Sequence, residues 1–249
     1  MRYPHVTVPL IAVAHGSRDP RAAATVRALL DAVRRARPGL PVRESYLDHA
    51  PPTPARVLSG LPEAVVLPLL LTAAYHSRVD IPRVLREVRG TRIRYGATLG
   101  PHPLLVRALE RRLAEAGVAV GDPEETAATA VVLVAAGSSD RRANEVIARI
   151  ARRWARERGW WAVAPAYASA AAPAPGAEVA RLLAAGAPRV VVAPYLLAPG
   201  YFADRVRRET LAAGAAAVGG VLGAAPELAE VVLERYDHAL ATERLAVPA

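Results

Sequence analysis

Three residues in the first half of the chain carry side chains that can bind a metal ion or accept a proton. His15 follows an apolar run with the length of a buried parallel strand, Asp48 follows a second predicted strand, and His76 lies in a long loop after the most apolar strand. Two neutral imidazoles and one carboxylate suit a divalent cation such as iron, cobalt, nickel or zinc. The sequence contains no His-Glu-x-x-His motif. So few ligands leave coordination positions open, and we therefore expect a metal in transit rather than in permanent storage.

Each of these residues also has a simpler structural explanation. A histidine can end a strand without binding a ligand, and Asp48 can cap the turn that follows it. Glu44 is a competing carboxylate, because strand alternation places Glu44 and Asp48 on the same face. His102 is either a residue at the edge of the site or an ordinary loop residue. These alternatives stay open at the level of the sequence.

Residues beside the two histidines are suited to an anionic group. Gly16 lets the chain approach a ligand closely, and Ser17 and Arg18 lie where a helix is expected to begin. A helix N-terminus offers free N–H groups and about half a positive charge. We therefore predict substrate contacts from Gly16, Ser17, Arg18, Arg78 and His102.

Alternating strands and helices must position these residues. Leu10 to Ala14 is an apolar run, Asp19 is a good N-cap, and Pro20 suits the first helical position. The patterns predict strands over 10–14, 42–47, 64–71 and 94–99, and helices over 20–37, 54–60, 82–89 and 103–116. This order favours a parallel sheet with helices on both faces. Ligands bind at the carboxyl ends of such strands, where His15 and Asp48 are expected.

The second half of the chain repeats the first at offsets of 121 to 126. Residues 12–19 (AVAHGSRD) correspond to residues 133–140 (LVAAGSSD), and three further segments match in the same order. We therefore predict an α/β protein with two similar doubly wound parallel-sheet lobes. The expected lobes cover residues 1–120, which carry the active residues, and residues 130–249, with a linker over 121–129.

Comparison of the two repeats separates fold from chemistry. Gly16 matches Gly137, so the fold is a sufficient explanation for that glycine. The polar residues of the first repeat are lost in the second, where His15, Asp48, His76 and His102 correspond to Ala136, Ser169, Phe202 and Ala225. Ala136 and Phe202 can neither bind a metal nor accept a proton. The apolar setting of Phe202 predicts a buried side chain.

The composition restricts the possible functions. The chain has no cysteine, which excludes disulfides, thiolate zinc sites and cysteine-held iron–sulfur clusters. All 32 basic residues are arginine, and the net charge of +9 favours an anionic partner. The lack of lysine disfavours Schiff-base and P-loop mechanisms. No stretch has the length of a membrane span and no nucleic-acid motif is visible, so we expect a cytoplasmic protein without membrane or nucleic-acid partners.

Three segments together resemble the sirohydrochlorin chelatases of the class II, CbiX/SirB type. They are Ala14-His-Gly-Ser-Arg18, Tyr46-Leu-Asp48, and the stretch from Pro68-Leu-Leu-Leu71 through His76 to Asp80-Ile-Pro82. The resemblance implies the chelatase fold, in which two α/β lobes face a central cleft. It also implies insertion of a divalent metal, Fe²⁺ or Co²⁺, into sirohydrochlorin without ATP. The metal is then a substrate, and no organic cofactor is implied. The chain is similar to the long, two-lobed members, and we expect a monomer because the two copies are fused.

The resemblance also assigns roles to residues of this chain. His15 and His76 correspond to the two active histidines of the family. Its acidic residue, commonly a glutamate, falls on Asp48, whose side chain is shorter. The substrate carries eight carboxylates, which agrees with the basic composition.

Two other functions compete with this one. A non-catalytic carrier of a metal or a tetrapyrrole would use the same ligands without turnover. A histidine phosphatase also places His-Gly after a first strand, but that chemistry usually needs arginine before the histidine, and here the residue is Ala14. The sequence does not distinguish iron insertion for sirohaem from cobalt insertion for cobalamin.

Overall fold

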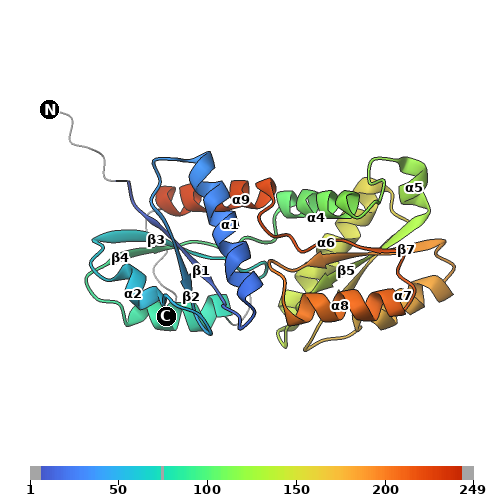
Figure 1. The fold of residues 1–249 in the computed structure, drawn as a ribbon, viewed down its shortest axis with the longest axis horizontal. Coiled ribbons are helices and arrows are strands. Elements are labelled where there is room, and N and C mark those ends of the chain that lie inside the picture. The colour runs from blue at the N-terminus through green and yellow to red at the C-terminus, as the bar shows by residue number, and fades with distance from the viewer. Residues whose placement is uncertain (1–6, 74–75, 243–249) are drawn as a thin grey trace. The chain divides into compact units, whose positions relative to one another are not determined.

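The structure is a computed structural model that describes residues 7–73 and 76–242. The chain forms two compact units, each with its own parallel sheet (Figure 1). One unit contains the chain up to Gly100 together with the chain from Ala224, and the other contains Pro101–Gly223.

The first unit is built on four parallel strands in the order β2-β1-β3-β4. Their bounds are Leu10–Ala14 (β1), Val42–Tyr46 (β2), Glu63–Pro68 (β3) and Arg92–Tyr95 (β4). Every residue of β1 is buried, as expected for a central strand with both faces covered. In the register, Ala14 is paired with Tyr46, so β1 and β2 end together at one edge of the sheet.

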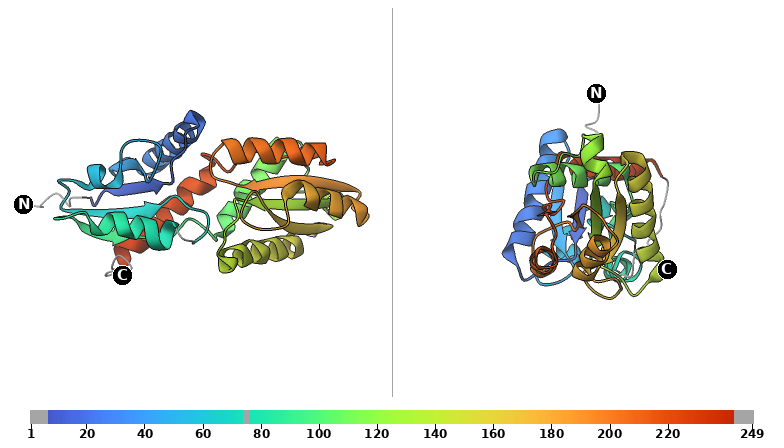
Figure 2. Two further views of the ribbon diagram at one scale, coloured as in Figure 1. Left: turned by 90° about the horizontal axis from the view of Figure 1, so that it is seen from below. Right: turned by 90° about the vertical axis from the view of Figure 1, so that its right-hand side faces the viewer.

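Helices cover both faces of this first sheet (Figure 2). On one face, α1 (Pro20–Ala36) packs against α9 (Pro226–Ala241). On the other, α2 (Pro54–Leu58) and α3 (Ile81–Arg86) enclose an apolar cluster that includes Ile11, Val13 and Leu85. A single π-helical turn, η1 (His76–Asp80), leads into α3.

The second unit has the same strand order, β6-β5-β7-β8, and all its pairs are parallel. Its strands are Thr129–Ala135 (β5), Ala162–Tyr167 (β6), Arg189–Tyr195 (β7) and Ala217–Val218 (β8). Its helices are Pro103–Glu115 (α4), Pro123–Ala127 (α5), Arg141–Arg158 (α6), Pro175–Ala184 (α7) and Tyr201–Ala212 (α8). Two similar four-stranded parallel sheets flanked by helices confirm the predicted α/β fold class.

The last helix of each repeat belongs to the other unit. Helix α4 follows the first repeat but packs against β7, and α9 follows the second repeat but packs against β3 and β4. Specific contacts hold both helices. In α4, the Arg112 guanidinium donates to the carbonyl of Leu222 at 2.9 Å. In α9, the Tyr236 hydroxyl donates to the carbonyl of Val8 at 2.5 Å.

These units differ from the lobes expected over 1–120 and 130–249. The difference arises because α4 and α9 bury their apolar faces on the sheet of the other repeat. The expected linker over 121–129 also belongs to the second unit. Asp122 caps α5 by accepting the Glu124 N–H at 2.9 Å, and the Glu125 carboxylate pairs with Arg189 at 2.8 Å.

Most predicted elements are found with small shifts of their ends. The largest difference is the fourth strand, predicted over 94–99 and observed at Arg92–Tyr95. Within the described residues, no helix has the length and apolar character that a membrane span requires. The expected cleft between the lobes stays a prediction.

Candidate metal and substrate site

The turns after β1 and β2 are packed directly against each other, which brings the backbones of His15 and Asp48 together. The Asp48 N–H donates to the His15 carbonyl at 2.9 Å. Gly16 has a φ of +94°, and a Cβ built on it would lie 1.8 Å from the Asp48 carbonyl oxygen. Only glycine fits there, for both conformational and steric reasons. His15 and Asp48 are both exposed at this edge of the sheet.

The second unit repeats this backbone arrangement without the chemistry. Gly137 has a φ of +89°, and its Cβ would lie 1.9 Å from the Ser169 carbonyl oxygen. The Ser169 N–H donates to the Ala136 carbonyl at 2.9 Å. The fold therefore requires the two glycines but does not require His15 or Asp48.

His76 begins the π-helical turn η1, and its side chain lies outside the described part of the chain, as do Ala74 and Tyr75. The turn itself is anchored at the edge of the sheet. Tyr95, the last residue of β4, donates its hydroxyl to the Ser77 carbonyl at 2.7 Å. Burial raises the pKa of Tyr95, so this hydroxyl stays protonated as a donor. Single π-helical turns frequently occur at functional sites.

The structure separates the two candidate carboxylates. Glu44 lies within β2, and its carboxylate is 3.9 Å from the guanidinium of Arg27. Burial, and after it the charge of Glu44, raises the pKa of Tyr46 to about 12. Asp48 lies beyond the strand on the exposed turn that contacts Gly16. Of the two carboxylates, that of Asp48 belongs to the turn that is hydrogen-bonded to His15.

The predicted anion-binding residues divide into two kinds. Ser17 builds the turn, because its hydroxyl oxygen accepts the Asp19 N–H at 3.0 Å, and Ser138 repeats this contact with Asp140 at 3.1 Å. Asp19 then caps α1 as expected by accepting the Arg21 N–H at 2.9 Å. In contrast, Arg18 in the turn after His15 and Arg78 in η1 are both exposed.

His102 lies at the start of α4. It belongs to the second compact unit, where its Nδ1 atom accepts the Leu104 N–H at 3.2 Å and caps α4. His102 therefore caps α4, and its contact with the substrate stays a prediction. Pro103 at the first helical position is the signal in the sequence for a helix start here.

The expectation that Phe202 is buried is wrong. Phe202 is 40% exposed, and its neighbour Tyr201 is 70% exposed. Both belong to the first turn of α8, after a loop that leaves β7. Sequence reasoning did not single out Tyr201, although it is next to the residue that matches His76.

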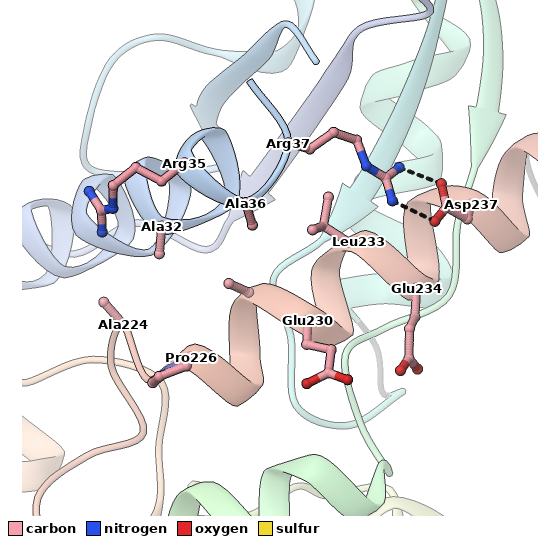
Figure 3. Close-up of a pocket in the computed structure, with 11 residues that line it drawn as sticks. Ala32, Arg35, Ala36, Arg37, Ala224, Pro226, Glu230, Leu233, Glu234 and Asp237 are labelled. Carbon is pink, nitrogen blue, oxygen red and sulfur yellow. Dashed lines mark hydrogen bonds and ion pairs between the residues drawn. The ribbon is translucent and has the colours of Figure 1, made fainter. Parts of the chain in front are cut away.

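Among the described residues, no three histidine, aspartate or glutamate side chains gather to hold a metal ion. The described pair is His15 and Asp48, and the third predicted ligand is the side chain of His76. A groove of about 740 Å³ between α1 and α9 contains none of the predicted site residues (Figure 3). The bidentate pair of Arg37 and Asp237, at 2.5 and 2.7 Å, lines this groove.

A family model and two relatives of known name match most of this chain. The CbiX family model matches residues 9–116 and 130–239, which are the two repeats. A sirohydrochlorin cobaltochelatase of Priestia megaterium is 29% identical over 81% of this chain and 68% of its own length. A sirohydrochlorin ferrochelatase of Bacillus subtilis is 31% identical over 80% of this chain and 78% of its own length.

A solved structure supports the same relationship at the level of the fold. The structure of SirB from Bacillus subtilis with Fe³⁺ superimposes with a TM-score of 0.78 at 26% identity, over 95% of this chain and 96% of that one. The family model matches both repeats of this chain. Together with these relatives, that match shows that the chain belongs to the CbiX family.

Proposed function

We propose that this chain is a sirohydrochlorin chelatase that inserts Fe²⁺ or Co²⁺ into sirohydrochlorin without ATP. One observation carries the proposal: the metal-competent residues His15 and Asp48 occupy a backbone frame that the second repeat keeps with Ala136 and Ser169. The fold does not need these side chains, so a chemical role explains them. Relatives that are named cobaltochelatase and ferrochelatase support the reaction.

His15, Asp48 and His76 receive the metal substrate in this proposal. Imidazole nitrogen and carboxylate oxygen suit both iron and cobalt. A set of three protein ligands leaves positions for water, which the ring nitrogens of the macrocycle can then replace. Asp48 is held by the backbone contact with Gly16, so its short side chain starts from a fixed position. Because aspartate is shorter than the glutamate that is common in the family, a metal bound by Asp48 would lie closer to the turn.

The same histidines have a second task, because insertion of a divalent ion displaces two pyrrole protons from the macrocycle. Neutral histidine can accept a proton near neutral pH. As the metal passes to the ring nitrogens of the macrocycle, the imidazole nitrogens that it leaves can accept protons. His15 and His76 are therefore proposed to take up these protons at that stage and pass them to water. Both residues are catalytic in this sense.

The anionic substrate is proposed to bind through the exposed Arg18 and Arg78 and through the backbone of Gly16 and Ser17. Arginine binds carboxylates with paired, charge-assisted hydrogen bonds. The net charge of +9 adds a long-range attraction for a substrate with many carboxylates. Ser17 is proposed to bind the substrate through its backbone, because its hydroxyl oxygen already accepts the Asp19 N–H.

The test is a spectroscopic assay of metal insertion. The protein is mixed with sirohydrochlorin and Co²⁺, or with Fe²⁺ under anaerobic conditions, and the conversion of the free to the metallated spectrum is followed. We expect many turnovers per protein molecule. A conversion that stops at one equivalent would instead indicate a carrier, and no conversion above the uncatalysed rate would refute the proposal.

A further inference from the structure

The two repeats carry different side chains on the loop that follows their third strand. In the first repeat this loop leads to His76. In the second, the corresponding position holds Phe202, with Tyr201 beside it. Tyr201 is 70% exposed and Phe202 is 40% exposed. The core does not require either ring, and adjacent exposed aromatic rings are typical of a binding surface.

Arg205 lies one turn further along α8 and is held against both rings. Its guanidinium carbon is 5.5 Å from the ring centroid of Tyr201 and 5.6 Å from that of Phe202. The two rings are themselves in edge contact, with centroids 5.7 Å apart. The Nε atom of Arg205 is buried and has no hydrogen-bond partner within the described part of the chain. The Glu209 carboxylate lies 3.7 Å from this atom.

The backbone places this group at the carboxyl edge of the second sheet. Strand β7 ends at Tyr195, and α8 begins after a five-residue loop. Gly200, immediately before Tyr201, has a φ of +152° with a ψ of −171°. That conformation is essentially limited to glycine. The aromatic pair therefore starts its helix at the edge where parallel sheets bind ligands.

We infer that Tyr201, Phe202 and Arg205 form an aromatic platform that binds the conjugated macrocycle of sirohydrochlorin. The rings contact its π face, and Arg205 binds one of the carboxylates at its periphery. A planar, conjugated anion matches both features of the platform at once. The inference rests on the proposed function, and it adds a binding surface for the face of the macrocycle to the carboxylate contacts proposed for Arg18 and Arg78.

The direct test is titration of metal-free sirohydrochlorin into the full-length protein without metal, followed by the absorbance of the macrocycle. The double variant Tyr201→Leu/Phe202→Leu keeps apolar volume and helix propensity but removes the aromatic faces. We expect its Kd to rise about 10- to 100-fold, the usual effect of losing a stacking contact. For Arg205→Gln we expect a rise of about 3- to 10-fold at low salt, and less at high salt because ions screen the charge.

A matched control comes from an exposed aromatic residue at the other edge of the same sheet. Trp161 is 39% exposed and directly precedes β6, so it lies at the amino edge. Trp161→Leu should leave the Kd for sirohydrochlorin unchanged. Tyr201→Phe, which keeps the ring, should bind like the parent protein. Thermal melts of all variants verify that they are folded.

Steady-state kinetics provides an independent readout. The double leucine variant should raise the KM for sirohydrochlorin, with kcat and the apparent KM for Co²⁺ within about twofold of the parent, because uniform binding is lost. The inference is overturned if this variant binds sirohydrochlorin as tightly as Trp161→Leu while the parent binds and metallates it. A parent protein that binds sirohydrochlorin but does not metallate it would refute the chelatase and leave the platform standing. A parent protein that does not bind it would overturn the platform.

Discussion

Replacing Gly16 with alanine tests the idea that the turn after β1 positions the metal-binding residues. The alanine Cβ would lie 1.8 Å from the Asp48 carbonyl oxygen, whereas real Cβ contacts are essentially never under 3.0 Å. The difference, 3.0 − 1.8 = 1.2 Å, is the least distance by which the two turns must separate. Since both contacting groups belong to the backbone, no side-chain rotation can relieve the overlap.

The size of the effect follows from this displacement. Misplacement of a catalytic group by about 1 Å costs roughly 100-fold in rate, so we expect Gly16→Ala to slow metal insertion by about that factor. The positive φ of +94° adds backbone strain, which costs about 1–3 kcal/mol for a residue other than glycine. For a chain of this length, that loss corresponds to a decrease of about 2–12 °C in Tm.

Gly137→Ala is the matched control, because Gly137 has nearly the same φ, +89°, and nearly the same overlap, 1.9 Å with the Ser169 carbonyl oxygen. The two variants should lose similar stability. Initial insertion rates are measured well below both melting temperatures and expressed per folded molecule. Only Gly16→Ala should lose most of its activity. Equal rates for the two variants would refute the role of this turn in positioning His15 and Asp48.

Four further variants test other parts of the structure. His15→Ala and His76→Ala should each slow insertion by roughly 10²- to 10⁴-fold, and parental rates at sub-saturating metal would contradict the site assignment. Phe202→Ala should change the free energy of unfolding by less than about 1 kcal/mol, because the ring is exposed; a larger loss in chemical denaturation would show that the ring is buried. Arg37 lowers the pKa of Asp237 through their hydrogen bonds, so this pair stabilises the fold above about pH 4, and its contribution is lost as the pH falls through the lowered pKa. Arg37→Ala should therefore lower Tm at pH 7, by the equivalent of at most about 1 kcal/mol for such an exposed pair, but not near pH 2. The same Tm difference at both pH values would contradict this account.

The sequence predicted the local structure around the candidate site well, because that structure depends on short-range signals. Asp19 and Pro20 mark the start of α1, and the structure has both in the expected positions. Gly16 and Gly137 mark the two turns, and each meets the backbone that follows the neighbouring strand. The start of the helix depends on residues that are close together in the chain. The two glycine turns depend on neighbouring strand ends, whose pairing follows from the fold class.

The exchange of terminal helices could not be predicted in the same way. Helix α4 has the amphipathic pattern of any surface helix, and that pattern does not specify which sheet it covers. The choice depends on distant contacts, such as those of Glu110 with Trp154 at 2.9 Å and with Arg158 at 2.7 Å. The exposure of Phe202 escaped prediction for a related reason. Its neighbours in sequence are apolar, but the first turn of α8 lies outside the core of its unit.

The two repeats together allow the requirements of the fold to be separated from those of the reaction. Where two backbone segments are in close contact, as at Gly16 and Gly137, glycine occurs in both repeats because no other residue fits. Ser17 and Ser138 also recur, and both use the hydroxyl oxygen to build the turn before a helix. Where the side chain is exposed at the same edge, as at His15 and Ala136, the repeats differ although the backbone hydrogen bonds are the same. Packing cannot account for that difference, so the exposed positions at the strand ends are where we propose that the two halves carry separate chemical tasks.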